Sequence, residues 1–122
     1  LPVVVGGHSL GGAMAATYAA DHDVSGLVLL AAYPSDSTDL SGEAFPVVSR
    51  MAQHDGVADA AKVTGGLDRL PGATRLITVD GAVHSFFGRY GPQDGDGVPT
   101  VDRAEAEAAI TGSLVEFFEA LA

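Results

Sequence analysis

The sequence predicts an α/β protein with a parallel sheet of about four strands and flanking helices. Short apolar runs rich in Val, Leu and Ile alternate along the chain with segments of helical spacing. Such alternation is typical of parallel sheets whose strands are joined by right-handed crossovers. Ionisable side chains gather directly after the apolar runs, and open parallel sheets bind ligands at the carboxyl ends of their strands. We therefore expect the functional site at that end of the sheet.

The first half of the chain predicts two strands and a helix. We expect the first strand over Leu1–Gly6, buried on both faces, because this apolar run is rich in Val and bounded by glycine. Leu10–Asp21 has Ala, Met and Tyr at helical spacing and predicts a helix. Val24–Tyr33 is a second apolar strand that ends before Pro34. Residues 34–45 are polar and full of turn formers, which predicts a loop.

The second half of the chain predicts two more strands with a weak helix between them. Pro46–Met51 is the third apolar strand, and Thr74–Val79 is the fourth. Val57–Leu70 has helical spacing, but Gly65 and Gly66 weaken it, since glycine costs about 1 kcal/mol relative to alanine inside a helix.

The end of the chain predicts a loop followed by the longest helix. Residues 85–100 are rich in glycine and predict the loop. We expect the helix over Asp102–Leu121, with Asp102 as its N-cap and Glu105 three residues later, as in a capping box. The apolar positions of this helix share one face: Ala106, Ile110, Leu114 and Phe117.

The composition narrows the possible functions. The 122 residues, 47% of them hydrophobic, suffice for one folded domain with its own core. The net charge of −10 argues against nucleic acids and anionic membranes as partners, because both need a basic patch. It suits a neutral or cationic small-molecule substrate. The absence of cysteine excludes thiolate catalysis and disulfides, and no apolar run is long enough to span a bilayer.

A serine between glycines joins the first predicted strand to the first predicted helix. The segment Gly7–Gly11 fits G-x-S-x-G, the pattern of a nucleophile on a sharp strand-to-helix turn. Such a turn forces Ser9 into strained φ/ψ space, and glycine suits positions 7 and 11 because side chains there would crowd it. At the amino end of the helix, free N–H groups favour negative charge, so we expect the Leu10 N–H to stabilise an oxyanion.

Two other glycine motifs do not fit this stretch. A phosphate-binding loop needs a lysine and a hydroxyl residue after its last glycine, but Ala13 and Met14 follow Gly12. The dinucleotide fingerprint G-x-G-x-x-G fails because the glycines lie at positions 6, 7, 11 and 12. The remaining alternative is a plain turn in which Ser9 is only the N-cap of the helix.

A serine nucleophile needs a base, and His84 is the best candidate of the histidines. His84 lies just past the last predicted strand, in the loop that follows Val79. His8 lies inside the serine turn with its side chain expected to point away from that of Ser9, so we interpret it as packing or pocket lining. His22 lies in a turn at a helix end and is expected to be solvated, whereas His54 could belong to the rim of the site.

The base needs an acid that orients it, and several aspartates compete for this role. Asp55 follows the third strand, with Gly56 after it to allow a tight turn, and it is the preferred candidate. Asp36 and Asp39 follow the second strand and remain open as alternatives. Asp59 fits the first turn of a helix better, and Asp80 lies only four residues before the histidine.

The loop after His84 contributes candidates for binding. Phe86 and Phe87, together with His8, are expected to line the substrate pocket, although the two Phe residues and Tyr90 could instead pack the loop down. The segment QDGDG at 93–97 has two acids at alternate positions, as a calcium loop begins, but it lacks the later glutamate. We therefore expect a turn-rich loop there, with neither a metal ion nor a cofactor.

The motifs together resemble a known family. GGHSLGGAMAA, GLVLLAAYP, AQHDGVAD and DGAVHSFFGRYGPQDGDG resemble the carboxyl-terminal half of α/β-hydrolases of the serine esterase, lipase and dienelactone-hydrolase-like kind. The last motif is similar to GNHAQFG-x-YGPQ-x-GDG of a bacterial subgroup of small hydrolases, with Ala82-Val83 here in place of Gly-Asn. The resemblance implies a Ser-His-Asp triad in which Ser9 is the nucleophile, Asp55 the orienting acid and His84 the base.

The resemblance also implies a function and a domain organisation. The function is cofactor-free hydrolysis of a small carboxylic ester through an acyl-enzyme. Thioester or lactone opening, C–C cleavage on the same triad, and a non-catalytic binding module are alternatives. Residues 1–122 are expected to be the carboxyl-terminal portion of a single domain, with further strands and a second oxyanion donor before Leu1. We therefore expect the chain alone to be poorly soluble or inactive, since its first strand would be an open edge.

Overall fold

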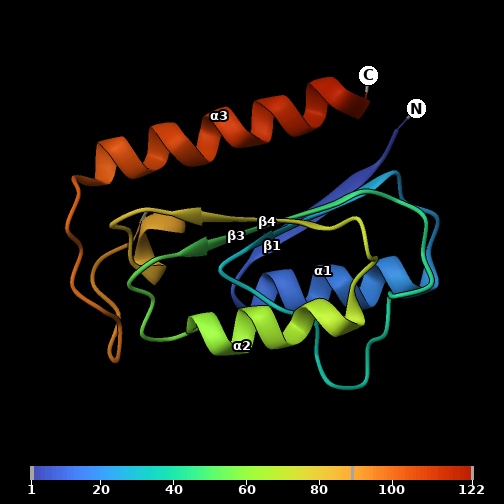
Figure 1. Cartoon of the computed structure of the whole chain (residues 1–122), viewed down its shortest axis with the longest axis horizontal. Helices are drawn as coiled ribbons and strands as arrows, with labels where there is room; N and C mark the ends of the chain where they lie inside the picture. Colours follow the sequence, from blue (N-terminus) through green and yellow to red (C-terminus); the bar gives the residue numbers. More distant parts are fainter. Residues whose placement is uncertain (1, 89, 122) are drawn as a thin grey trace.

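A computed structural model describes residues 2–88 and 90–121 and contains a four-stranded sheet between helices on its two faces (Figure 1). The strands lie in the order β1-β2-β3-β4, and each neighbouring pair is parallel. Their bounds are Val4–His8 for β1, Gly26–Leu30 for β2, Val47–Ala52 for β3 and Arg75–Val79 for β4. The α/β class and the parallel sheet predicted from the sequence are confirmed.

The helices divide between the two faces of the sheet. Helices α1 (Leu10–Asp21) and α2 (Ala60–Gly65) lie on one face, and α3 (Arg103–Leu121) lies on the other (Figure 1). Buried Ala16 of α1 packs with Leu27 and Leu29 of β2. Buried residues of α3 form a second core cluster with β3 and β4, which includes Ala52, Val79, Ala106 and Ile110. Two short 3-10 helices complete the fold, η1 (Gly66–Arg69) and η2 (His84–Phe87).

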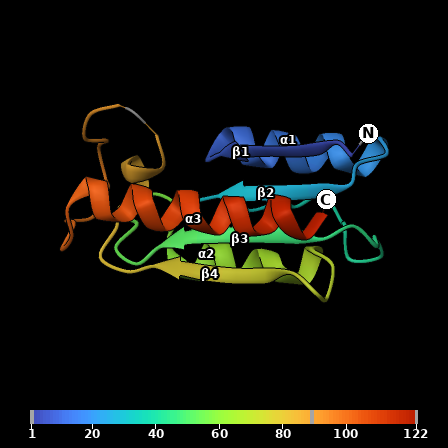
Figure 2. The ribbon, with the colours of Figure 1, turned by 90° about the horizontal axis from the view of Figure 1, so that it is seen from above.

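The strand order brings the carboxyl ends of all strands to one edge of the sheet. The chain moves from β1 to β4 without reversing its direction across the sheet (Figure 2). In register, His8 lies opposite Leu30, Leu30 opposite Arg50, and Ala52 opposite Val79. The loops after β1, β3 and β4 therefore begin at the same end of the sheet, and they carry Ser9, Asp55 and His84.

The first strand differs from its prediction. β1 begins at Val4 and continues to His8, two residues beyond the expected end, while Leu1 lies outside the described residues. Val4 and Val5 are only partly buried and Gly6 is exposed, so the expectation of burial on both faces is wrong. The reason is that β1 is the edge of the sheet, where it pairs with β2 alone among the described residues.

The second predicted helix divides into two at its glycines. α2 ends at Gly65, and the tighter η1 begins at Gly66. α2 also begins later than predicted, at Ala60, because the side chain of Asp59 accepts from the Lys62 N–H (2.9 Å) and caps the helix there. The glycines thus mark the change from α to 3-10 geometry.

The other helices follow the sequence closely. α1 spans Leu10–Asp21, as predicted, and α3 begins one residue after Asp102, whose carbonyl accepts the first helical hydrogen bond, from the Ala106 N–H (3.2 Å). A capping bond from the Asp102 side chain stays a prediction. The predicted loop 85–100 is wrong at its start, since η2 covers His84–Phe87. Among the described residues, no helix has the length and apolarity needed to cross a membrane.

Candidate active site

Ser9 lies in a strained turn between β1 and α1. Its φ of 57° and ψ of −124° lie outside the regions that residues with a side chain usually adopt. The Ser9 N–H donates to the Leu30 carbonyl (3.0 Å), and the Ser9 carbonyl accepts from the N–H groups of Gly12 (3.0 Å) and Ala13 (3.3 Å). These bonds to two elements hold the backbone in a conformation that would otherwise relax. The strain expected from the sequence is present.

The glycines around Ser9 have unequal roles. A Cβ on Gly7 would lie 2.3 Å from the Gly11 carbonyl carbon, so glycine is needed there. A Cβ on Gly11 would meet nothing within 4 Å, which makes the expected crowding at that position wrong. The close approach is at Gly12, whose Cβ would lie 2.4 Å from the Ala32 Cβ. The reason is that α1 packs against the end of β2 through Gly12, whereas a side chain at position 11 would project into open space.

The side chain of Ser9 contacts His84 and does not cap the helix. The Ser9 Oγ lies 2.9 Å from His84 Nε2, and the opposite ring nitrogen, Nδ1, lies 2.8 Å from Asp55 Oδ2. A carboxylate oxygen only accepts, so Nδ1 carries the hydrogen, and the unprotonated Nε2 accepts the Ser9 hydroxyl. The side chains of His84 and Asp55 are both 0% exposed. The interpretation of Ser9 as a plain N-cap is therefore wrong.

Asp55 is fixed by its own turn. Its Oδ1 accepts from the N–H groups of Val57 (2.8 Å) and Ala58 (2.7 Å), while Oδ2 accepts from His84. Both oxygens of the carboxylate thus have partners, and its orientation toward the imidazole is set by the backbone. Hydrogen bonds to an ionised carboxylate are also stronger than those between neutral groups.

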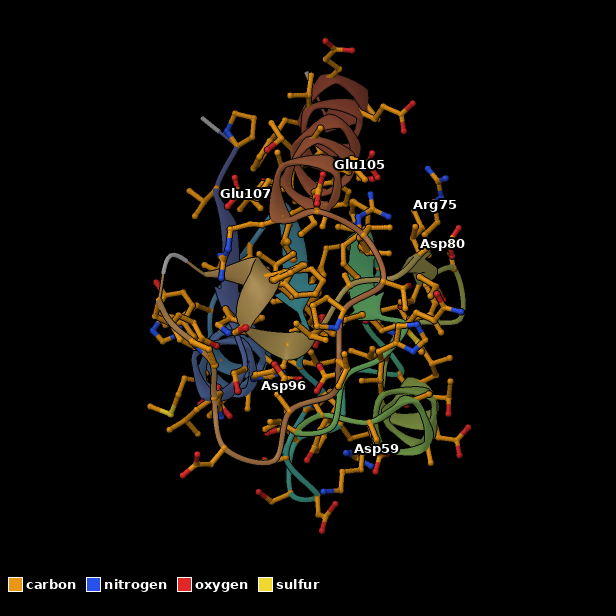
Figure 3. The ribbon with its side chains drawn as sticks, turned by 90° about the vertical axis from the view of Figure 1, so that its left-hand side faces the viewer. Asp59, Arg75, Asp80, Asp96, Glu105 and Glu107 are labelled. Atoms are coloured by element: carbon orange, nitrogen blue, oxygen red, sulfur yellow. The ribbon has the colours of Figure 1, made fainter. Side chains whose placement is uncertain are left out.

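The competing aspartates lie elsewhere. Asp36 is exposed, with its nearest cation Arg69 at 3.8 Å, and Asp39 is exposed and accepts from the Ser41 N–H (2.9 Å). Asp59 lies at the start of α2, and Asp80 is exposed at the end of β4 (Figure 3). Among the described residues, Asp55 is the carboxylate that bonds the His84 ring.

His8 lies beside His84 rather than in a pocket. The two ring centroids are 4.6 Å apart. His8 Nδ1 donates to the Leu30 carbonyl (3.2 Å), and Nε2 lies 2.6 Å from the Tyr90 hydroxyl, which also lies 3.2 Å from Gln93 Oε1. Partial burial lowers the pKa of His8; the Leu30 carbonyl opposes this shift, and the neighbouring His84 adds to it. His8 therefore favours its neutral form next to the histidine that contacts Ser9.

The cavity that contains Ser9 is lined mainly by apolar side chains, with Tyr33 and Ser35 among its polar members. Its volume is about 340 Å³. It is bounded by α1, the end of β2 and the turn after Asp55, with these residues among its walls: Leu10, Ala13, Ala32, Tyr33, Val57 and Ala58. Ala31, which also lines it, has a positive φ of 51°. No local pattern in the sequence indicates this lining, because alanines of a helix and of a loop come together only in the folded chain.

The expected pocket residues Phe86 and Phe87 lie on another side of η2. They line a separate cavity of about 220 Å³ toward α3, together with Ile110. Both rings pack against the core cluster under α3, and the Phe87 ring is stacked near His8 at 6.1 Å between centroids. His8, Phe86 and Phe87 are not among the residues that line the cavity at Ser9, because the apolar side of η2 packs into the core. Their expected contact with substrate stays a prediction.

The remaining predictions for this region have mixed outcomes. Leu10 begins α1, where no preceding helical turn supplies an acceptor for its N–H, so its expected oxyanion role stays a prediction. His54 Nε2 lies 3.4 Å from the Thr100 hydroxyl, and its expected place at the rim of the site stays a prediction. His22 is exposed and stacks on Tyr18. No group of acids or histidines suited to a metal ion was found within residues 2–88 and 90–121.

Sequence reasoning missed Asp96. The sequence predicts only a turn-rich loop at residues 93–97, but the Asp96 carboxylate accepts hydrogen bonds from the backbone N–H groups of His84 and Ser85 (3.0 Å each). Its place in a segment of alternating Gly and Asp could have indicated a loop that binds backbone N–H groups. Nothing in the sequence identified which backbone it would contact.

Comparisons with known proteins agree with this fold. A model of the alpha/beta hydrolase family matches residues 2–108. The structure of an alpha-beta serine hydrolase homologue from Coxiella burnetii superposes with a TM-score of 0.59 at 22% sequence identity. That match covers 72% of this chain and 43% of the Coxiella chain, so the present chain spans less than half the length of its structural relative. A search of curated proteins found no significant match.

Proposed function

Because this chain belongs to the alpha/beta hydrolase family, we propose that it contributes the catalytic triad of a serine hydrolase that cleaves small carboxylic esters. One observation carries the proposal: the hydrogen-bonded series from Ser9 Oγ through the His84 ring to Asp55, with distances of 2.9 and 2.8 Å. A nucleophile, a base and an orienting acid within hydrogen-bond reach are the arrangement that activates a serine.

Acylation begins at the Ser9 hydroxyl. Its oxygen attacks the carbonyl carbon of the ester while its proton passes to His84 Nε2. The resulting tetrahedral intermediate carries a negative oxygen, and the N–H of Leu10 at the start of α1 is one donor for it. The intermediate collapses by breaking the bond to the alcohol oxygen, which receives the proton from His84. An acyl-enzyme on Ser9 remains.

Deacylation repeats these steps with water. His84 Nε2 takes a proton from the water as its oxygen attacks the acyl carbon, and the proton then returns to the Ser9 oxygen as the acid leaves. In both acylation and deacylation, Asp55 accepts a hydrogen bond from the Nδ1–H of His84 and stabilises the imidazolium that forms. Protein side chains supply every proton transfer, so the proposed reaction needs no cofactor.

The cavity beside Ser9 favours a small, uncharged substrate group. Its lining contains alanines and valine and no charged side chain, and its volume of about 340 Å³ is at the small end of ligand pockets. We propose that a short apolar acyl group occupies it. An anionic group would bind unfavourably in this cavity, because it would be removed from water without a charged partner.

The test is made on the full-length protein, with a chromogenic ester of a short acid and a fluorophosphonate probe. Ser9→Ala should abolish both ester hydrolysis and labelling by the probe. Ser113→Ala, which changes an exposed helix-surface hydroxyl bonded to Ala109, is the matched control and should retain both. Hydrolysis or labelling retained by Ser9→Ala would contradict the proposal. Labelling of Ser9 with turnover of thioesters or lactones in place of esters would keep the triad and change the substrate class.

A further inference from the structure

The carboxylate of Asp96 joins three separate backbone segments. Its Oδ1 accepts from the N–H groups of His84 (3.0 Å), Gly97 (2.9 Å) and Gly56 (3.4 Å). Its Oδ2 accepts from the N–H of Ser85 (3.0 Å). Figure 3 shows Asp96 next to η2, the short helix that begins at His84. One side chain therefore contacts both the segment that carries His84 and the segment that follows Asp55.

The backbone around Asp96 packs closely on the turn of Asp55. A Cβ on Gly97 would lie 1.7 Å from the His54 carbonyl oxygen, and a Cβ on Gly56 would lie 2.2 Å from the Gly95 carbonyl oxygen. Gly95 has a φ of +85°, which glycine adopts without strain. The segment Gly95–Gly97 and the turn at 54–56 thus meet backbone to backbone, and no side chain could be inserted between them.

Asp96 is held in its ionised form. Partial burial opposes its ionisation, but the N–H groups of Ser85, His84, Gly97 and Gly56 outweigh this effect and lower the pKa of the carboxyl. An ionised carboxylate accepts stronger hydrogen bonds than a neutral acid. The charge therefore strengthens the contacts to the two segments.

We propose that Asp96 is a positioning residue that holds His84 and Asp55 at hydrogen-bonding distance from each other. The expected loss of kcat rests on the proposed hydrolase function. The expected effect on the bond between His84 and Asp55 does not. His84 follows β4 and Asp55 follows β3, so their bond of 2.8 Å depends on how two loops are placed. Oδ1 of Asp96 contacts the main chain at His84 and directly after Asp55. Asp96 does not line the cavity at Ser9.

The kinetic test compares Asp96→Ala and Asp96→Asn with Asp94→Asn. Asp94 lies two residues earlier in the same exposed loop, and none of the hydrogen bonds between described residues involves its carboxylate. Asp96→Ala should lower kcat on the order of 100-fold, because displacement of a catalytic group by about 1 Å costs that much. Asp96→Asn should cause a smaller loss, since one oxygen remains as acceptor. KM should change little in either variant, and Asp94→Asn should match the wild type.

A spectroscopic test is independent of catalysis. The proton between His84 Nδ1 and Asp55 should give a low-field proton NMR signal in the wild type, in Ser9→Ala and in Asp94→Asn. In folded Asp96→Ala the signal should broaden or move upfield. If the protein hydrolyses no ester but the signal responds in this way, the proposed function fails and the positioning role stands.

Three outcomes would overturn the positioning role. The first is a folded Asp96→Ala with unchanged signal and unchanged kcat. The second outcome applies if Asp96→Ala does not fold. In that case, a folded Asp96→Asn with the kcat and the low-field proton signal of the wild type would overturn the role. The third is that neither variant folds by circular dichroism, which would make Asp96 a determinant of stability alone.

Discussion

His8 and His84 lie side by side with ring centroids 4.6 Å apart, yet only His84 contacts Ser9. His8 instead bonds the Leu30 carbonyl and the Tyr90 hydroxyl. The two rings come from opposite edges of the sheet: His8 is the last residue of β1, and His84 begins η2, after β4. Positive charges on both rings at once would repel each other. A neutral His8 therefore avoids repulsion with the imidazolium that forms on His84 in the proposed reaction.

The first prediction concerns the pH dependence of stability. Partial burial and the adjacent His84 lower the pKa of His8 below 6.5, against the Leu30 carbonyl and the charges of Asp55 and Asp96. Below pH 6.5 the unfolded chain therefore binds more protons at this position than the folded chain does. The stability contributed by neutral His8 is present above pH 6.5 and is lost as the pH falls through the lowered pKa.

Urea unfolding between pH 5 and pH 8 checks this prediction. The free energy of unfolding should decline toward acid pH in the wild type and decline less steeply in His8→Gln. The difference between the two proteins isolates His8, because the other titrating groups are common to both. Parallel curves for the two proteins would show that His8 has no such effect.

The second prediction concerns the choice of acid. Asp55→Asn keeps the size of the side chain but removes the charge that fixes the His84 tautomer, so kcat should fall on the order of 10⁴-fold. Asp36→Asn and Asp39→Asn make the same chemical change at exposed positions and should leave kcat unaltered. Steady-state kinetics with a short-chain ester measures all three. A large loss in either control with a mild effect at Asp55 would reassign the acid.

The third prediction uses adjacent glycines as a matched pair. Gly12→Ala should lower the free energy of unfolding by about 1–3 kcal/mol, because its Cβ would overlap the Ala32 Cβ. Gly11→Ala meets open space in the first turn of α1 and should raise the free energy of unfolding by about 0.5–1 kcal/mol. Denaturant unfolding of the two variants should give changes of opposite sign. Equal changes would contradict the packing described for this turn.

The fourth prediction concerns substrate size. Ala13 lines the cavity at Ser9, so Ala13→Leu should reduce its volume and raise KM for esters of longer acids more than for acetates. Ala20→Leu, at an exposed position of the same helix, is the control and should not change the preference. The measurement is kcat/KM over a series of acyl lengths. An unchanged length preference in Ala13→Leu would place the acyl group outside this cavity.

Much of the fold was predictable because its signals are local. The apolar runs located the four strands to within a few residues, and helical spacing located Leu10–Asp21 with its bounds. The strained conformation of Ser9 followed from the glycines around it and the adjoining strand and helix. The burial of β1 was overestimated, since the sequence of an edge strand of a parallel sheet is as apolar as that of a central one.

The candidate site was predictable only in part. Ser9 and His84 could be chosen because functional residues of such sheets lie just after the strands. Asp36, Asp39 and Asp55 all lie after strands as well, so this position did not distinguish among them. The packing of Phe86 and Phe87 against the core under α3 was not predictable, because nothing local shows which side of η2 enters the core. Asp96 was overlooked because its partners are backbone N–H groups, which every residue except proline carries.

The sequence by itself determined the parallel α/β architecture, the turn at Ser9 and the position of His84 after the last strand. Periodicity, turn chemistry and steric crowding act over a few residues, so a chain displays them without being folded. The tertiary structure decided that Asp55 contacts His84, that Gly12 is the close approach of α1, and that Asp96 contacts the loops after β3 and β4. Those contacts join segments that are distant in the chain, and they depend on strand order and register, which no local pattern specifies.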